Sequence, residues 1–256
     1  MKSICFMNLK GGVAKTASTI NMAAILASDH QKRVLVIDAD SQGNSTEFFD
    51  GDPAKGNMAL LLRAAGMTDW SGYGLIQASN FPGVDILCGS DELMDLDLTA
   101  VAQNDAMAHA LADLRDSLAE RDAYDYILID CPPAFNAASA AALLAADDVI
   151  IPIKLDAFSL RGLVNLHRQV ANMQTLNPNL RIAGCLRTMW YASATLQGAD
   201  KTLENSGLPI FATKIRRSSK VDDMTFSQQP LAVFSPRSGA GVDYRRFVKE
   251  YLEVTT

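Results

Sequence analysis

A short glycine- and lysine-rich stretch near the start of the chain has the residue types that bind phosphate groups. It reads Lys10-Gly11-Gly12-Val13-Ala14-Lys15-Thr16, after an apolar run and before a helical pattern. A glycine-rich loop between a strand and a helix presents backbone N–H groups to phosphate oxygens, and the helix N-terminus favours negative charge. We therefore predict that Lys15 reaches the β- and γ-phosphates of a nucleotide and that the Thr16 hydroxyl binds Mg²⁺.

The stretch departs from the ordinary P-loop pattern, G-x-x-x-x-G-K-[ST]. The first glycine of that pattern falls on Leu9 and the second on Ala14. The stretch instead fits K-G-G-x-x-K-[ST], in which Lys10 is a second lysine; a flexible surface loop is the alternative interpretation. A left-handed backbone costs alanine ~1–2 kcal/mol. We therefore predict a right-handed conformation at Ala14.

Carboxylates follow two other apolar runs. Asp38 and Asp40 follow Val34–Ile37, and Asp130 ends the run Tyr126–Ile129 before a Cys-Pro-Pro segment. Carboxylates at the ends of buried strands suit a Mg²⁺ site or the orientation of an attacking water. Asp38 and Asp40 could instead cap the next helix.

Apolar runs alternate with helical patterns along all 256 residues, with no repeat and no linker composition. This alternation predicts a single domain, residues 1–256, with a doubly wound, mostly parallel central sheet and helices on both faces. The segment Gly66–Pro82 is expected to be irregular. The predicted strands are Ser3–Met7, Arg33–Asp38, Val84–Cys88, Tyr126–Asp130, Asp148–Ile153, Ile182–Thr188 and Ile210–Thr213. The predicted helices are Lys15–Ser28, Asn57–Ala65, Asp105–Arg121, Ala137–Ala145, Leu160–Thr175, Ala194–Ser206 and Tyr244–Leu252.

Composition excludes several classes of protein. The four cysteines form no C-x-x-C pair and the three histidines are scattered, which argues against zinc sites, iron–sulfur clusters and disulfide frameworks. We find no membrane span and no signal peptide, so we expect a cytoplasmic protein. The net charge of −6 is uneven, because residues 181–256 have more basic than acidic side chains and the rest has the reverse. A basic C-terminal third is either a polyanion-binding face or an ordinary solvated surface.

Together these motifs resemble the ParA/MinD family of ATPases, whose deviant Walker A loop carries two lysines. The segments Asp38–Asn44 and Asp130–Pro133 are similar to two further motifs of the family, and the likeness continues to about Leu252. Weaker matches are Ile151–Lys154, Phe158–Leu163, Leu186–Met189, Thr213–Lys220 and Phe234–Ala240. The chain departs from the family at Ser41 and Arg216, where proline is usual, and at Ala17, where threonine is usual.

The resemblance implies an ATPase switch with ATP and Mg²⁺ as cofactors. Asp40 would orient or activate the attacking water, and Lys10 would reach the ATP of a second subunit in an ATP-bound homodimer. Asp38, Asp130 and Thr16 would surround Mg²⁺. The nucleotide would contact Lys10, Gly11, Gly12, Val13, Ala14, Lys15, Thr16, Ala17, Arg187 and Met189.

The family also implies partners. ParA-like members contact the backbone of double-stranded DNA non-specifically and are stimulated by a ParB-like centromere-binding protein, which would place this protein on the nucleoid when ATP is bound. The candidate DNA contacts are Lys201, Arg217, Lys220, Arg245, Arg246 and Lys249. The C-terminal helix is expected to dock on the core, so we predict no membrane binding. Three alternatives stay open: a cargo-positioning ATPase that does not bind DNA, a metabolic or metal-delivery enzyme of the same superfamily, and a protein that has lost efficient hydrolysis.

Overall fold

An eight-stranded sheet forms the centre of the molecule, in the order β3-β4-β2-β5-β1-β6-β7-β8. The computed structural model describes residues 1–67, 72–156 and 159–255. Each pairing in the sheet is parallel except that of β3 with β4. The strands are β1 (Lys2–Phe6), β2 (Val34–Asp38), β3 (Gln77–Ala78), β4 (Val84–Leu87), β5 (Tyr126–Asp130), β6 (Asp148–Ile153), β7 (Arg181–Trp190) and β8 (Ile210–Arg216).

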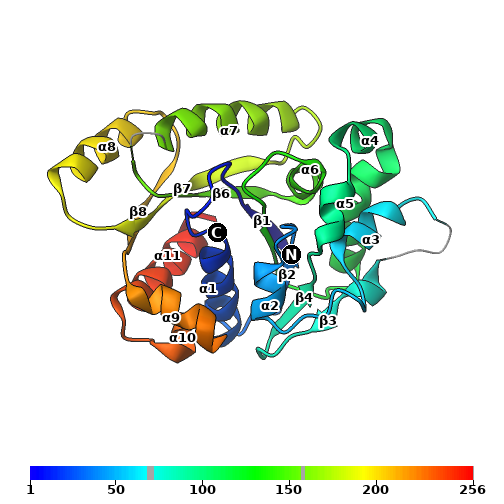
Figure 1. The fold of residues 1–256 in the computed structure, drawn as a ribbon, viewed down its shortest axis with the longest axis horizontal. Helices are drawn as coiled ribbons and strands as arrows, with labels where there is room; N and C mark the ends of the chain where they lie inside the picture. The colour runs from blue at the N-terminus through cyan, green and yellow to red at the C-terminus, as the bar shows by residue number, and fades with distance from the viewer. Residues whose placement is uncertain (68–71, 157–158, 256) are drawn as a thin grey trace.

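Helices cover both faces of this sheet (Figure 1). On one face α1 and α11 pack together, with α2, α9 and α10 at their end; the other face carries α5, α6, α7 and α8. The α-helices are α1 (Lys15–Ser28), α2 (Asn44–Phe48), α3 (Met58–Arg63), α4 (Leu98–Gln103), α5 (Asp105–Glu120), α6 (Ala137–Ala145), α7 (Ser159–Met173), α8 (Ala194–Glu204), α9 (Ser219–Ser227), α10 (Leu231–Phe234) and α11 (Gly239–Thr255). Two 3₁₀ helices, η1 (Tyr73–Leu75) and η2 (Asp91–Asp95), lie between them.

The central strands are buried on both faces, as expected of a parallel sheet between helices. Alternate side chains of β1 enter different cores: Ile4 and Phe6 pack toward α1 and α11, whereas Cys5 packs toward the helices of the other face. The apolar runs of the sequence therefore become continuous strands. The predicted doubly wound α/β fold is confirmed.

The predicted bounds of β5 and β6 agree with the structure, whereas the longest helix, α11, was predicted over Tyr244–Leu252 and spans Gly239–Thr255. The predicted bounds of α1 and α6 agree with the structure, but the short α2, α4, α9 and α10 and the two-residue strand β3 were not predicted. Part of Gly66–Pro82 is ordered as η1 and β3, while residues 68–71 of that segment, and Phe158 of a family match, lie outside the described residues. Short elements bury too few side chains to leave a periodic pattern.

The strand at the C-terminal edge is longer than predicted. Arg216 extends β8, and its backbone N–H donates to Asp243 Oδ2 at 3.0 Å, while its guanidinium Nε donates to the same oxygen at 2.7 Å. A proline at this position would lack that N–H. The departure from the family pattern at Arg216 therefore lengthens the strand and ties it to α11.

The register of three neighbouring strands brings the sequence motifs to one edge of the sheet. Asp130 at the end of β5 is aligned with Phe6 of β1 on one side and with Asp38 of β2 on the other. The loop that follows β1 carries the two lysines. Ligands of doubly wound sheets bind at this carboxyl edge.

Candidate nucleotide-binding site

The loop between β1 and α1 turns through two left-handed residues. Gly12 has φ 66°, which glycine adopts without steric cost. Ala14 has φ 66° and ψ 36°, so the predicted right-handed conformation is wrong. Its carbonyl already accepts the first helical hydrogen bond from Ser18 N–H at 3.0 Å, and Thr188 Oγ1 donates to the carbonyl of Val13 at 3.0 Å. The helix start and the β7 anchor together hold alanine in a conformation that costs ~1–2 kcal/mol.

Lys15 begins α1 and is buried. Only 7% of its surface is exposed, and its ammonium donates to the Lys10 carbonyl at 3.3 Å. Burial lowers the pKa of Lys15, although Asp130, Cys131 and Asp40 oppose the shift. Lys15 forms no ion pair within the described residues. A buried ammonium without a carboxylate partner is suited to an anionic ligand.

Two buried carboxylates face each other across β2 and β5. Asp38 Oδ2 accepts from the backbone N–H and the hydroxyl of Thr46, each at 2.8 Å, and Asp130 Oδ2 accepts from the hydroxyl of Ser45 at 2.7 Å. Burial is the main cause that raises the pKa of both carboxyls, and the negative charge of Asp130 adds to the shift at Asp38. A cation between them would favour their charged forms.

The pair fits a magnesium site. Asp130 Oδ1 is buried and has no hydrogen-bond partner within the described residues. The Thr16 hydroxyl also lies close enough to oppose the upward pKa shift of Asp130. No group of three or more His, Cys, Asp or Glu residues that could hold a metal occurs in the described part of the chain. The two carboxylates and the Thr16 hydroxyl suit Mg²⁺, which usually binds one or two carboxylates together with waters and phosphate oxygens.

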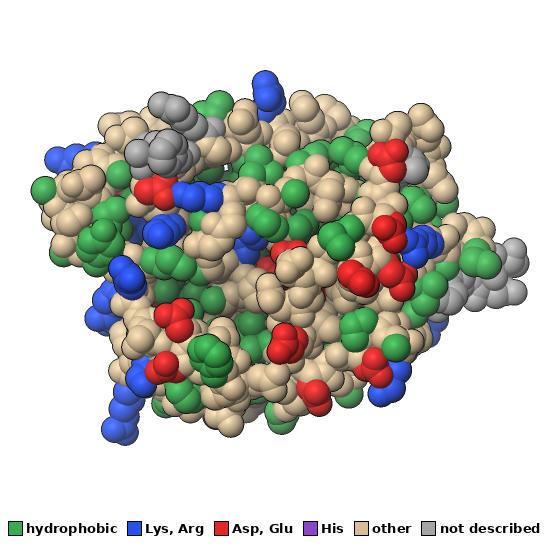
Figure 2. Space-filling view, viewed as in Figure 1, with side chains coloured by type: hydrophobic (Ala, Val, Ile, Leu, Met, Phe, Trp, Pro, Cys, Tyr) green, Lys and Arg blue, Asp and Glu red, His purple; other side chains and the backbone are tan. Residues whose placement is uncertain are grey.

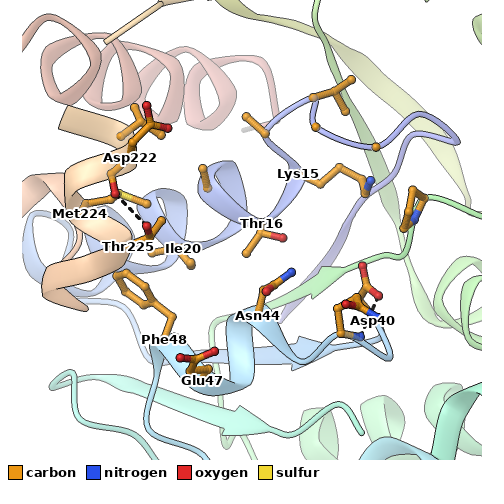
Figure 3. Close-up of a pocket in the computed structure, with 18 of the residues that line it drawn as sticks. Lys15, Thr16, Ile20, Asp40, Asn44, Glu47, Phe48, Asp222, Met224 and Thr225 are labelled. Carbon is orange, nitrogen blue, oxygen red and sulfur yellow. Dashed lines mark hydrogen bonds between the residues drawn. The ribbon is translucent and has the colours of Figure 1, made fainter. Parts of the chain in front are cut away.

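Asp40 stands at the turn after β2, near the phosphate loop. Its backbone N–H donates to Asp38 Oδ1 at 3.1 Å, and its own Oδ1 accepts from the Gln42 N–H at 3.1 Å. Figure 3 shows Lys15 and Asp40 at the same end of the pocket, with Thr16 and Asn44 beside them. A carboxylate fixed in this way can orient or deprotonate a water molecule.

A cavity of about 670 Å³ runs from these polar residues to an end where apolar side chains lie among Glu47, Asp222 and Thr225 (Figure 3). In Figure 3 Ile20, Phe48 and Met224 lie at the end away from Lys15 and Asp40. The size is typical of small-molecule sites, and a phosphate-binding loop joined to an end with apolar and hydrogen-bonding side chains matches a triphosphate joined to a base. The whole Gly11–Ala17 segment and Met189, which were predicted to contact a nucleotide, line this cavity.

Two of the predicted contacts are placed elsewhere. Arg187 is buried against α8, where its Nη1 donates to Asp200 Oδ1 at 2.8 Å, so the expectation that it lies beside the base is corrected. Its Nη2 donates to the carbonyl of Ala212 at 3.2 Å, so the guanidinium lies between α8 and β8. Lys10 forms an ion pair with Asp156, and its backbone N–H donates to Asn8 Oδ1 at 3.0 Å. The second lysine is therefore held within its own chain.

Sequence reasoning missed several residues of the cavity. Helices α1, α2 and α9 contribute side chains that were not predicted to lie there: Ile20, Phe48, Val221, Asp222, Met224, Thr225 and Phe226, with Gln228 just after α9. The sequence motifs beside these helices, Asp38–Asn44 and Thr213–Lys220, were identified, but α2 and α9 themselves were not predicted. An apolar side chain in a short helix gives no signal that separates a base-binding residue from core.

The candidate DNA contacts fall into two groups. Three of them pair with acids: Lys220 with Asp223 at 2.9 Å, Arg245 with Asp29 at 2.7 Å and Lys249 with Glu253 at 3.7 Å. Lys201 of α8, Arg217 after β8 and Arg246 of α11 are exposed and have no side-chain ion pair within the described residues. Helices α8 and α11 lie on opposite faces of the sheet beside β8 (Figure 1). Among the described helices, none has the length and apolar character needed to cross a membrane.

Comparison with known proteins gives a family match. A family model described as an AAA domain matches residues 1–182. The chain is 30% identical over 255 residues to the sporulation initiation inhibitor protein Soj of Bacillus subtilis, covering 97% of each protein. It is 28% identical over 258 residues to the chromosome partitioning protein ParA of Caulobacter vibrioides, covering 98% of this chain and 94% of the relative.

The fold also matches a solved structure with a nucleotide. The structure is that of cobyrinic acid a,c-diamide synthase from Mycobacterium smegmatis with bound ATP analogue and magnesium. It has a TM-score of 0.81 and 25% sequence identity, and the match covers 99% of this chain and 95% of that one. The overall fold is therefore shared, over nearly the whole of both chains, with a protein whose structure contains an ATP analogue and magnesium.

Proposed function

This chain belongs to the AAA domain family, as a relative of ParA and Soj over nearly its whole length, and on that premise we propose that it is an ATPase switch that partitions DNA. Its cargo would be a plasmid, an integrative element or a chromosome. The observation that carries the ATP-binding part of the proposal is the cavity at the carboxyl edge. Its walls include the Gly11–Ala17 loop, a buried lysine with no acidic partner in the described part of the chain, and apolar side chains at the far end.

ATP and Mg²⁺ are the proposed ligands of this cavity. The backbone of Gly11–Ala17 and the ammonium of Lys15 would bind the phosphates, with Met189 near the base. Thr16, Asp38 and Asp130 would hold Mg²⁺, which would neutralise charge on the phosphates. The bound ATP analogue and magnesium of the synthase structure support the same pair of ligands.

Asp40 is the proposed residue for the hydrolytic step. It would orient a water molecule toward the γ-phosphate and accept the proton from that water. Lys15 would stabilise the charge that develops on the phosphate oxygens. Lys10 would act across an ATP-dependent homodimer, on the nucleotide of the partner subunit, once it has left Asp156. Slow hydrolysis, stimulated by a ParB-like protein, would then release the dimer.

DNA binding is the finer part of the proposal. Backbone contacts would be sequence-independent and would weaken with salt, since each neutralised phosphate releases counterions. Lys201, Arg217 and Arg246 are the strongest candidates, because their side chains form no ion pair within the described residues. The protein would occupy the cytoplasm and bind the nucleoid in the ATP state.

A second candidate function is the positioning of a protein cargo without DNA. The observation that favours it is that Lys220, Arg245 and Lys249 already have acidic neighbours. Binding of random-sequence duplex with ATP at several salt concentrations distinguishes the two functions. Affinity that falls as salt rises supports partitioning, whereas no binding at any salt supports the positioning function.

The switch itself is tested by the size of the protein in solution. We expect dimers with ATP and Mg²⁺ and monomers with ADP. Lys10→Ala should abolish the ATP-dependent dimer, while Asp40→Ala should retain it because hydrolysis is blocked. Dimers that form equally well without nucleotide would contradict the proposed function.

A further inference from the structure

Two consecutive side chains of α2 contact the two buried carboxylates at the carboxyl edge of the sheet. The Ser45 hydroxyl donates to Asp130 Oδ2 at 2.7 Å, and the Thr46 hydroxyl donates to Asp38 Oδ2 at 2.8 Å. Ser45 is fully buried, and Thr46, Asp38 and Asp130 are at most 3% exposed. Hydrogen bonds to a carboxylate are stronger in such a water-excluded place than in solvent. The short helix therefore holds both carboxylates that are proposed to bind Mg²⁺.

The backbone at the start of α2 places these hydroxyls. Gly43 precedes the helix with φ 65° and ψ 24°, a left-handed conformation that glycine adopts without steric cost. Its N–H donates to the Asp40 carbonyl at 3.1 Å, and its own carbonyl accepts from the Glu47 N–H at 2.9 Å. The turn after β2 therefore passes directly into the helix, so that Ser45 and Thr46 lie against the ends of β2 and β5.

The two carboxylates depend on α2 to different degrees. Asp38 also accepts backbone N–H groups, that of Thr46 on Oδ2 at 2.8 Å and that of Asp40 on Oδ1 at 3.1 Å. No backbone N–H donates to the side chain of Asp130 within the residues that the structure describes. The terminal torsion of an aspartate is broad, so strand β5 alone does not fix the plane of this carboxylate. The orientation of Asp130 therefore depends on hydroxyl groups, and Ser45 supplies the bond to Oδ2.

The bond from Ser45 leaves the other oxygen of Asp130 available. Oδ1 is buried and accepts no hydrogen bond among the described residues. A buried carboxylate oxygen without a donor is costly unless a cation or a donor reaches it. A carboxylate that binds a metal is usually hydrogen-bonded itself, and that outer bond orients it toward the metal. The bonded Oδ2 and the free Oδ1 of Asp130 fit this arrangement.

We propose that Ser45 is a positioning residue for magnesium, whose hydroxyl holds Asp130 Oδ2 so that Oδ1 is presented to the cation that accompanies ATP. The inference rests on the proposed function, because Mg²⁺ is expected at this edge together with ATP. Loss of an outer hydrogen bond of this kind typically weakens metal binding about 10–100-fold. The Thr46 hydroxyl should matter less, since backbone N–H groups still hold Asp38 when that hydroxyl is removed.

Exposed carboxylates could also attract a divalent cation to this face of the molecule. Figure 2 shows Asp and Glu side chains gathered on the face that carries α2 and α3. Asp50, which follows α2, is exposed and forms no ion pair within the described residues. Attraction to such surface charges is weak and is screened by salt. Asp50→Asn is therefore a control for charge alone, and asparagine tolerates the left-handed backbone there, where φ is 57°.

The test measures the affinity of the full chain for a fluorescent, non-hydrolysable ATP analogue, once with Mg²⁺ and once with EDTA. The ratio of the two affinities is the gain that Mg²⁺ provides. Ser45→Ala should lower this gain about tenfold or more and leave the affinity in EDTA within about twofold. Ser45→Thr retains the hydroxyl and should keep most of the gain, while Thr46→Val should lower it about threefold or less. Thermal melting verifies that each variant is folded.

A double variant tests whether Ser45 acts through Asp130. In Asp130→Asn most of the gain should already be lost, and adding Ser45→Ala should lower it by no more than about twofold further. Two controls should keep the gain within about twofold of the parent. They are Asp50→Asn and Ser79→Ala, which removes a hydroxyl that donates to the Val84 carbonyl at 2.6 Å, at the amino end of β4.

The outcomes separate the positioning role from the proposed function. A gain that Ser45→Ala leaves unchanged, or that Ser79→Ala lowers equally, would overturn the positioning role alone. A large further loss in the Asp130→Asn background would also overturn it, because Ser45 would then act by another route. A parent chain that binds no analogue, with Mg²⁺ or with EDTA, would instead refute the proposed function and this inference together.

Discussion

The carboxyl edge of the sheet and the surface of the C-terminal third both carry many charges, but they compensate them differently. At the edge, Lys15 is buried without an acidic partner and Asp130 Oδ1 has no hydrogen-bond donor among the described residues. In the C-terminal third, Arg216 is paired with Asp243 at 2.7 Å and Arg187 with Asp200 at 2.8 Å. A ligand would neutralise the unpaired charges at the edge, whereas most charges of the C-terminal third neutralise one another in ion pairs.

This difference distinguishes a ligand-binding site from an ordinary charged surface. A buried charge without a partner destabilises the protein unless a ligand binds it, so it indicates a ligand. An exposed cation beside an acid contributes little stability and gives no such indication. The argument for a nucleotide site is therefore stronger than that for a DNA-binding face, and it reduces the six basic candidates to Lys201, Arg217 and Arg246.

Replacement of Asp40 should give the largest effect. Asp40→Ala removes the group that orients the water, and we expect ATP hydrolysis to fall about 100-fold or more while ATP affinity changes little. Steady-state phosphate release and nucleotide titration measure the two quantities. Asp113→Asn, an exposed change on α5, serves as control. If Asp40→Ala hydrolyses ATP as fast as the parent chain, either another residue orients the water or the parent chain itself no longer hydrolyses ATP efficiently.

Two substitutions compare the two regions directly. Lys15→Met should lower ATP affinity about 100-fold and leave the ligand-free protein as stable or more stable, because the buried ammonium has no acidic partner to lose among the residues that the structure describes. Arg216→Met should leave ATP affinity unchanged and lower the free energy of unfolding by about 1–3 kcal/mol, since Asp243 would stay buried without its cation. Urea unfolding and nucleotide titration of both variants give the result. The reverse pattern would remove the distinction between the regions.

The buried carboxylate pair predicts a pH dependence of the Mg²⁺-free protein. Burial raises the pKa of Asp38 and Asp130 above the unfolded values of about 4, so the folded chain binds more protons than the unfolded chain between these values. Stability should be greatest below the unfolded pKa and should fall as pH rises through the folded pKa, by on the order of 2 kcal/mol. Asp38→Asn should flatten this profile, and Mg²⁺ with ATP should reverse much of the loss. Unfolding free energies measured across the pH range test it; a profile that rises with pH would contradict the pKa direction.

DNA binding should distinguish paired from unpaired cations in the C-terminal third. Arg217→Ala and Arg246→Ala should each weaken duplex binding about threefold to tenfold and reduce the salt slope by about one. Lys249→Ala is the matched control. Because Lys249 already pairs with Glu253, its replacement should weaken duplex binding less. Affinity is measured with ATP and Mg²⁺ at several salt concentrations. Equal losses from all three variants would show that pairing within the chain does not decide which cations reach DNA.

The sequence allowed prediction of the fold and of the residues at the polar end of the cavity, but of few of those at its other end. The loop, Asp38, Asp40 and Asp130 follow long apolar strands, and their chemistry is local to a few residues, so type and spacing were sufficient. The apolar end depends on how α2, α9 and β7 come together, and Phe48 and Met224 have no pattern that distinguishes them from core. Arg187 was misplaced for a related reason: its position on β7 was predicted, but the side of the strand end that it faces depends on Asp200, thirteen residues away.

The smallest expected effect concerns strain at Ala14. Its φ of 66° costs alanine ~1–2 kcal/mol, and Ala14→Gly would remove that cost while increasing the entropy of the unfolded chain. We expect a net gain of about 0.5–1 kcal/mol in the free energy of unfolding. Ala199→Gly in the middle of α8 is the control and should lose about 1 kcal/mol, because glycine weakens an ordinary helix. Urea unfolding measures both. Opposite signs would show that the edge stores strain where α8 stores none, whereas a loss at both positions would mean that Ala14 is not left-handed in solution.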